Sequence, residues 1–393
     1  MKKKCWKTIL FLTLLFYAST SLSVPPQSGE VGFQDGVFSL ISNDKNFEMK
    51  IGGRFQLRYW YAYPDENYPY IVWEETSTFE VYQARFFIWG NAFNPKWKYK
   101  LQLDFAKTTP LVDAYIDYNY TDYLNLTMGR FKVPFTRQKL ASGTVLLFPR
   151  RSISNDVMNL GRDIGLMMWG GLWDNRFVYS VGVFNGDGED SKLNNGKLKM
   201  YVGRVVFQPF GELSLDEARF KIGNGLKLAI GTSYSYNEPP ASDLNNDNDP
   251  ENALDTRWGV EVAAEWKRLF FAGEANWKFY NIDYPEKHGI ESFGWYTQSG
   301  VIIIPAKLQL GVRYSWLDPN IDNNNTDGSD ADIAEEFTLG LNYCIHSVRL
   351  FLQGSYSLLL KDYKDYPDVV TSGPYEIDTA IEQRVIIQLQ III

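Results

Sequence analysis

The chain has 393 residues, a formal net charge of −8 and an aromatic content of 16%. It contains two cysteines, and because Cys5 falls in the leader described below, Cys344 alone remains in the mature chain, which excludes an internal disulfide. We expect no nucleic-acid partner for so acidic a chain, since such binding rests on clustered basic charge.

The first residues have the layout of a cleaved secretory signal. Four lysines among the first seven residues precede the apolar run 9–18, and small residues follow before Val24. Ten apolar residues are too few to cross a bilayer as a helix, and no apolar run of about 18 residues occurs later in the chain. We therefore expect a signal peptide at 1–23, a short periplasmic segment at 24–46, and membrane spans made of strands.

From residue 47 onward, apolar and polar residues alternate in segments of about ten residues. In 97–106, five apolar side chains fall on one face, while Lys98, Lys100 and other polar residues fall on the opposite face. This is the period of a β-strand, and turn-forming stretches separate the segments. The pattern predicts sixteen strands, at 47–60, 79–92, 97–107, 111–120, 123–131, 162–170, 175–186, 198–208, 225–237, 257–268, 269–282, 292–303, 307–317, 335–345, 346–360 and 379–393.

Alternation alone does not say which face is wet, because a soluble sandwich with an apolar interior has the same period. The segment 257–267 favours an apolar outer face, since Trp258 and Trp266 flank small aliphatic residues on one side of the strand. At about 3.3 Å per residue and a tilt near 40°, these tryptophans lie roughly 20 Å apart along the membrane normal, close to the ~25 Å apolar band of outer-membrane barrels.

The lengths of the connections also fit such a barrel. With both ends of the barrel sequence placed in the periplasm, the connections that face outward are long and polar, apart from 107–110. Those that face inward are short, apart from 209–224. Bacterial barrels have this asymmetry, so we predict an all-β fold in which 47–393 form one transmembrane antiparallel β-barrel in the outer membrane of a Gram-negative-type bacterium.

Several stretches resemble the phosphate-selective porins O and P. The residues that carry this resemblance are 128–135, 148–151, 161–165 and 183–186, with 52–56, 104–105 and 113–115 upstream of them. The resemblance extends from about residue 33 to the end of the sequence. It implies a sixteen-stranded, usually trimeric, diffusion channel, and it implies that the third outer loop folds into the channel.

The third outer loop is also the basic part of an otherwise acidic protein. Loops 238–256 and 318–336 carry six and seven acidic residues without a base, whereas 132–162 holds six bases against Asp156, a net charge of +5. An apolar core at 145–148 would suit an inward-folded loop better than a solvated one. Because guanidinium groups replace part of the water that an anion gives up, we expect an anion-selective constriction formed by Arg137, Lys139, Arg150, Arg151 and Arg162. The alternative is a solvated loop or one that binds anionic lipid.

Further bases fall on the polar faces of the predicted strands. Arg54, Arg58, Arg85 and Lys100 come from three consecutive strands and could form a basic wall inside the barrel. Lumen arginines equally often pair with carboxylates such as Asp104, so solute guidance and structural pairing both remain open.

Catalytic and metal-binding patterns are weak. His288, expected in an outer loop, has no neighbouring nucleophile motif, so an outer-membrane enzyme is a distant alternative. The Asp/Asn clusters at 243–249 and 322–332 lack the ligand order of a dedicated calcium loop. About 23 mature residues precede the first strand, too few for the plug domain of an energy-coupled transporter.

The sequence therefore predicts a passive outer-membrane porin that is neither an enzyme nor a cofactor or metal protein. Its expected partners are outer-membrane lipid, small anions or other hydrophilic solutes, and two further copies of itself in a homotrimer. The competing hypothesis is a surface structural or adhesive barrel whose lumen is blocked and whose acidic outer loops are the functional surface.

Overall fold

The computed structural model describes residues 29–34, 37–64, 75–188, 199–239, 253–284, 286–321, 333–346, 349–362 and 379–393. The predicted signal peptide at 1–23 and the clusters at 243–249 and 322–332 lie outside the described residues. Among the residues that are described, no helix is long and apolar enough to cross a membrane.

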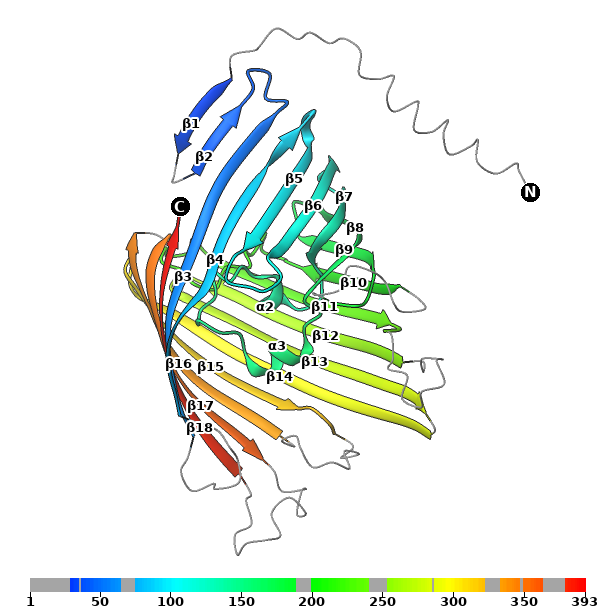
Figure 1. Cartoon of the computed structure of the whole chain (residues 1–393), viewed down its shortest axis with the longest axis vertical. Helices are drawn as coiled ribbons and strands as arrows, with labels where there is room; N and C mark the ends of the chain where they lie inside the picture. The colour runs from blue at the N-terminus through cyan, green and yellow to red at the C-terminus, as the bar shows by residue number, and fades with distance from the viewer. Residues whose placement is uncertain are drawn as a thin grey trace, which may run out of the picture.

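Sixteen antiparallel strands form one closed barrel (Figure 1). Each strand from β3 to β17 pairs with the next, and β18 pairs with β3. At this seam the main chains of Gly53 and Ile393 exchange hydrogen bonds of 2.7 and 2.9 Å. The strands are β3 (Glu48–Pro64), β4 (Thr76–Ala92), β5 (Asn94–Asp104), β6 (Leu111–Thr121), β7 (Leu124–Lys132), β8 (Arg162–Leu172), β9 (Phe177–Phe184), β10 (Met200–Phe207), β11 (Leu226–Asn237), β12 (Ala253–Trp266), β13 (Leu269–Tyr284), β14 (Glu286–Ile304), β15 (Leu308–Asp318), β16 (Ile333–His346), β17 (Leu350–Asp362) and β18 (Thr379–Ile392).

The sixteen predicted strands correspond one to one with β3 to β18, which confirms the predicted barrel. The largest difference is at the β13–β14 hairpin, where pairing continues to Tyr284 and Glu286. His288, which we expected in an outer loop, therefore lies in β14, with its backbone paired to Ile282. The hairpin extends further than predicted because each added residue pair satisfies backbone donors and acceptors.

Two strands precede the barrel in a region where the sequence predicted none. β1 (Glu30–Gln34) and β2 (Val37–Ile41) form a hairpin, and β2 pairs with the first residues of β3. The β3 residues that pair with β2 end at Ile51, and those that pair with β18 begin at Arg54. One strand therefore has two partners along the same edge, first the hairpin and then the closing strand of the barrel.

The outer surface of the barrel is apolar and its interior is polar. In β16, Phe337 and Leu339 are each 45% exposed, whereas the alternating residues Thr338 and Asn342 are each 1% exposed. A soluble barrel with an apolar interior would have the opposite arrangement. The exposure pattern therefore resolves the ambiguity left by the sequence period and identifies the polar face as the lumen.

Aromatic side chains form a row across the outer faces of β12 to β15. The ring centroids of Trp258 and Trp277 are 4.9 Å apart, those of Trp277 and Phe293 are 4.7 Å apart, and those of Phe293 and Trp316 are 5.8 Å apart. Trp258 and Trp266 are 47% and 52% exposed, as expected for outward residues. Rows of this kind mark the membrane interfaces of β-barrels.

One end of the barrel carries short turns, and we call it the short-turn end. Six of the seven connections there have four residues or fewer, and the exception is the eighteen-residue stretch 208–225 between β10 and β11, called the fourth turn below. Residues 133–161, called the third loop, join β7 to β8 and carry α2 (Arg137–Leu140) and α3 (Ile153–Met158). Figure 1 shows both helices on the concave side of the strands.

Candidate functional site

The middle of the third loop is buried. Leu147 and Phe148 are each 1% exposed, although they belong to a long connection between two wall strands. The Leu147 carbonyl accepts a hydrogen bond of 2.9 Å from Nδ2 of Asn342 in β16, and the Leu146 carbonyl accepts one of 3.0 Å from Nε2 of Gln353 in β17. Amide side chains of the lumen face thus bind the main chain of the third loop, which explains the apolar core seen in its sequence.

Glycines in β15 and β16 leave room for the two buried side chains. A Cβ atom on Gly311 would lie 2.9 Å from Cγ of Leu147, and one on Gly340 would lie 2.7 Å from the ring of Phe148. The guanidinium of Arg313 lies 4.7 Å from the centroid of the same ring. A side chain at either glycine would overlap the third loop, so these positions fit the loop to the wall.

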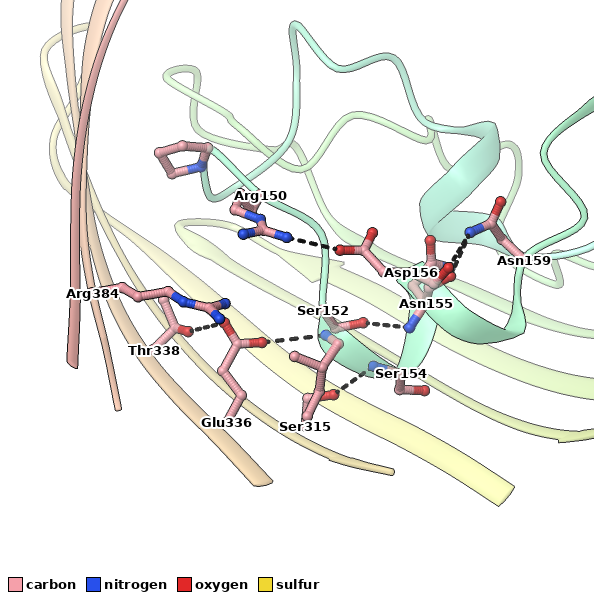
Figure 2. A network of polar contacts seen from close by, with 12 residues as sticks. Arg150, Ser152, Ser154, Asn155, Asp156, Asn159, Ser315, Glu336, Thr338 and Arg384 are labelled. Carbon is pink, nitrogen blue, oxygen red and sulfur yellow. Dashed lines mark hydrogen bonds and ion pairs between the residues drawn. The ribbon is translucent and has the colours of Figure 1, made fainter. Parts of the chain in front are cut away.

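The helix α3 is bound to the same wall through its first turn (Figure 2). The Ser152 hydroxyl caps the helix. The backbone N–H of Ser154 donates to Oγ of Ser315 at 3.3 Å, and the N–H of Ile153 donates to the Glu336 carboxylate at 3.3 Å. Backbone donors at the start of a helix have no partner within it, so wall side chains satisfy them here.

The helix α2 is bound to β13 in the same way. The Glu274 carboxylate accepts hydrogen bonds of 2.9 and 2.6 Å from the N–H groups of Arg137 and Gln138. The Arg137 guanidinium donates to the carbonyl of Ser214 in the fourth turn at 2.7 Å and lies 3.9 Å from Glu261. Arg137 therefore links the third loop to the wall and to the fourth turn.

Two further arginines make contacts around the third loop. Arg58 in β3 donates to the carbonyl of Pro149 at 2.9 Å, and its guanidinium lies 3.4 Å from the centroid of the Tyr82 ring. Arg150 forms an ion pair of 3.5 Å with Asp156 of α3 (Figure 2). Arg58 thus holds the loop main chain, while Arg150 faces a carboxylate of its own loop.

A cavity of about 580 Å³ lies between the third loop and strands β3 to β8. Its lining combines charged groups with aromatic and amide side chains. Eight bases and three acids give the lining a formal charge of +5, in contrast to the −8 of the whole chain. The charged lining residues are Arg54, Arg85, Lys100, Lys107, Lys132, Lys139, Arg151 and Arg162 with Asp113, Asp117 and Asp156.

Several of these bases are paired with carboxylates of the wall. Asp113 lies 2.7 Å from Arg162 and 3.4 Å from Lys100, and Asp104 lies 2.8 Å from Arg85. A carboxylate shared between two cations leaves excess positive charge beside it. Structural pairing and a basic lining therefore coexist, which are the two possibilities that the sequence had left open.

Six of the nine residues proposed from the sequence line this cavity, and three do not. The six are Lys139, Arg151 and Arg162 from the predicted constriction and Arg54, Arg85 and Lys100 from the predicted wall. The three that are not lining residues are Arg137, Arg150 and Arg58, although Arg150 pairs with Asp156 and Arg58 lies over Tyr82, which both line the cavity.

Other lining residues were not singled out from the sequence. Lys132 donates to the carbonyls of Leu140 and Ala141 at 2.9 and 2.8 Å, at the point where β7 enters the third loop. The sequence feature that could have identified Lys132 as a lining residue is its position in the basic stretch 132–162. Lys107 lies in a short outer connection, and nothing in the sequence relates that connection to the third loop.

The surroundings shift the pKa values of two side chains in the third loop, Arg151 and Asp156. Burial lowers the pKa of the Arg151 guanidinium, which donates to the carbonyls of Gln138 and Ala141 at 2.9 and 3.0 Å. Partial desolvation raises the pKa of Asp156, and the neighbouring Arg150 and Arg151 oppose this shift. Asp156 and the neighbouring arginines of the loop therefore each favour the charged form of the other.

No group of three or more His, Cys, Asp or Glu side chains in the described part of the chain is arranged to hold a metal ion. The side chain of His288 lies outside that part. The described residues do bring together a cavity with a basic lining beside the third loop, a charge arrangement that suits the binding of anions.

Comparison with known sequences gives a consistent result. The family model described as phosphate-selective porin O and P matches residues 49–366. Porin O of Pseudomonas aeruginosa is 25% identical over 256 residues, which cover 61% of this chain and 54% of that protein. The matched segments span 54% to 65% of the lengths of the curated relatives.

Solved structures with the same fold are distant in sequence. The outer-membrane channel DcaP of Acinetobacter baumannii has a TM-score of 0.60 and 14% identity, with 88% of this chain and 97% of that chain covered. An anion-selective porin from Comamonas acidovorans has a TM-score of 0.54 and 13% identity, with coverages of 87% and 99%. At this level of identity the likeness establishes the barrel fold alone.

Proposed function

Because the chain belongs to the phosphate-selective porin O and P family, we propose that it is an outer-membrane diffusion porin that passes small hydrophilic solutes and prefers small anions. Transport is passive and involves no bond making. Phosphate is one candidate among the small anions. The observation that carries the proposal is the +5 lining of the cavity beside the third loop.

The width of the barrel explains why the third loop matters. A sixteen-stranded barrel leaves an aqueous channel, so a selective channel needs an element that narrows it. We assign this role to the third loop, folded inward, with Lys139 and Arg151 lining the same cavity as Arg54, Arg85 and Arg162. Planar guanidinium groups suit oxyanions because they donate two parallel hydrogen bonds.

A second cavity supports a continuous route for the solute. It has a volume of about 430 Å³ and shares six lining residues with the first, among them Arg54 and Lys100. Its other lining residues include Lys98 and Trp89, near the short-turn end. Solute that passes the third loop would thus remain beside basic side chains.

Planar-bilayer recording tests the proposal directly. Under a KCl gradient, the reversal potential should have the sign of anion preference, and Arg151→Gln should move it towards cation preference. Arg268→Gln is the matched control, since this base lies in the β12–β13 turn outside both cavities. A barrel that shows no discrete conductance steps would instead support the structural or adhesive alternative.

Assembly into a homotrimer is a separate part of the proposal and rests on family membership. Cross-linking in native outer membranes should give a trimeric species that dissociates on heating. Recovery of monomers alone would remove the trimer and leave the proposed channel intact.

A further inference from the structure

The fourth turn enters the barrel from the short-turn end, and part of it is buried there. Leu213 is 4% exposed and packs in a cluster with Phe270 and small residues of β10 to β13. Phe220 is 7% exposed and packs against Cys344 and Phe351, with the two phenylalanine centroids 5.9 Å apart. Leu213 packs on β10 to β13 and Phe220 packs on β16 and β17, so the fourth turn crosses the lumen between these two groups of strands.

The fourth turn meets the third loop inside the barrel. The carbonyl of Val145 accepts hydrogen bonds of 2.8 and 2.7 Å from the N–H groups of Glu217 and Ala218. In return, the Glu217 carboxylate accepts a hydrogen bond of 3.0 Å from the N–H of Leu147. Two connections that start at opposite ends of the barrel are therefore joined by main-chain contacts.

Wall side chains hold the fourth turn in place. Gln309 in β15 accepts from the N–H of Arg219 at 3.0 Å and donates to the carbonyl of Glu217 at 3.1 Å. Arg219 forms an ion pair with Glu265 of β12. The N–H of Ala306 donates to the carbonyl of Phe220 at 2.7 Å. The fourth turn is thus fastened to β12, β15 and the turn before β15.

The two cavities lie on the other side of the third loop. Their lining residues come from β3 to β8, from the third loop, from Lys107 and from Ile392 at the end of β18. No residue of the fourth turn belongs to either lining, and all eighteen are described.

From these contacts we infer that the fourth turn closes the lumen beside β10 to β17, so that solute passes only between the third loop and β3 to β8. Within this arrangement, Glu217 is a positioning residue: its carboxylate fixes the main chain of the third loop at Leu147 and so sets the width of the route. This inference rests on the proposed porin function and specifies where in the barrel transport occurs.

Thiol labelling distinguishes the two sides of the lumen. Gln102 in β5 lines both cavities, whereas the native Cys344 is covered by the fourth turn. In reconstituted bilayers, the anionic reagent sulfonatoethyl methanethiosulfonate should lower the conductance of Gln102→Cys and leave the unsubstituted protein unchanged. Loss of current in the unsubstituted protein, or none in Gln102→Cys, would overturn the inference.

Substitution of Glu217 tests the positioning role. Glu217→Ala removes the acceptor for the Leu147 N–H, so open-channel current fluctuations should increase, the anion-to-cation permeability ratio should fall, and Cys344 should label faster. Glu217→Gln keeps an acceptor and should behave as the unsubstituted protein does. Identical behaviour of the alanine variant and the unsubstituted protein would contradict the role.

A further variant covers the case in which Glu217→Ala fails to assemble. Phe220→Ala leaves the Glu217 hydrogen bonds in place and removes the ring beside Cys344, so it should speed labelling of Cys344 without changing selectivity. If labelling stays slow, the fourth turn is not what covers this side. An unsubstituted protein without any conductance would contradict the proposed function itself. A conducting protein with an accessible Cys344 would contradict only the inference that the fourth turn closes the lumen beside β10 to β17.

Discussion

Two parts of the lumen wall, β3 to β8 and the strands around β16, have the same alternating sequence pattern but make different contacts. In β5, Lys100 and Gln102 alternate with outward residues and line the cavities. In β16, Thr338 and Asn342 alternate in the same way, yet Asn342 binds the main chain of the third loop. A polar lumen face can therefore serve water and solute or hold another part of the chain.

The chemistry of the side chains differs between these walls. Several of the side chains that bind the third loop are uncharged amides, among them Asn342, Gln353 and Gln390. An amide is both donor and acceptor, so it can satisfy a buried carbonyl or N–H without bringing a charge into the interior. The wall of β3 to β8 instead carries bases that line a cavity, and one of its carboxylates, Asp113, is shared between Lys100 and Arg162.

Removing a charge should therefore lower the free energy of unfolding far more on strands such as β15 and β16, which bind the third loop, than on β3 to β8, which line the cavities. Arg313 is 2% exposed and pairs with Glu336 at 3.1 Å, so Arg313→Met leaves a buried carboxylate without its cation. The expected loss in the free energy of unfolding is about 3–5 kcal/mol. Lys100→Met removes a cation from a more exposed pair and should cost about 0–1 kcal/mol.

Urea unfolding followed by tryptophan fluorescence measures both losses. The double variant Arg313→Met with Glu336→Met should recover part of the stability, because it leaves no unpaired charge. Equal losses for Arg313→Met and Lys100→Met would remove the distinction between the walls.

A smaller effect is expected where the wall accommodates a loop side chain. In Gly340→Val the added Cβ would lie 2.7 Å from the ring of Phe148. Such overpacking costs about 1–3 kcal/mol, and it should also displace the third loop and alter conductance. Gly354→Val is the control, since nothing lies within 4 Å of a Cβ there. Unchanged stability and conductance in Gly340→Val would mean that the loop is not fitted to this wall.

Selectivity should depend on which of two adjacent arginines is replaced. Arg151 lines the cavity, whereas Arg150 is not a lining residue and its charge is opposed by Asp156, so Arg151→Gln should shift the reversal potential more than Arg150→Gln. One charge ~5 Å from a monovalent anion contributes about 0.8 kcal/mol in water, which permits a severalfold change in permeability ratio. The shift should be largest at low salt.

Replacing Arg151 with lysine separates the effect of the positive charge from that of the guanidinium group. Arg151→Lys should preserve anion preference and weaken any specific phosphate block, because lysine keeps the charge without the planar donor arrangement. A larger shift for Arg150→Gln would place the constriction on the other face of the loop.

The smallest expected effect concerns pH. Burial raises the pKa of Glu217 above its ordinary value of 4.5, while the hydrogen bond from the Leu147 N–H and the charges of Arg137 and Arg151 oppose the shift. The folded protein therefore holds this proton to a higher pH than the unfolded chain, so the contribution of Glu217 to the free energy of unfolding falls as the pH rises above 4.5. Glu217→Gln should lack this component, and parallel stability curves against pH for the two proteins would contradict the shift.

The period of the sequence was sufficient to predict the barrel, because apolar and polar residues alternate wherever one face meets lipid and the other the lumen. The same reasoning placed Arg54, Arg85 and Lys100 inside, where they line the cavity. It could not identify the β1–β2 hairpin, since two five-residue strands are too short for a period to stand out.

The contacts of individual bases could not be predicted. Arg58 and Arg85 occupy similar places in the pattern, yet Arg58 binds the carbonyl of Pro149, 91 residues away in sequence. Whether a base meets water or a carbonyl depends on such distant partners, and alternation contains no information about them. The fourth turn was recognised as unusually long, but its burial depends on Leu213 and Phe220 finding places on strands far along the chain.

The seam between β3 and β18 has a consequence for how the protein reaches its native state. Gln56 donates to Gln390 at 2.6 Å across 334 positions of sequence and also to the carbonyl of Gly143, while Gln390 donates to the carbonyl of Thr144. Contacts of such range form late, because the intervening chain must first be ordered. The third loop can occupy its native position only when the first and last barrel strands have met, so closure and channel formation should share one rate. In refolding into lipid vesicles, protease protection of the third loop should rise together with the heat-modifiable form, and protection that precedes closure would contradict this order.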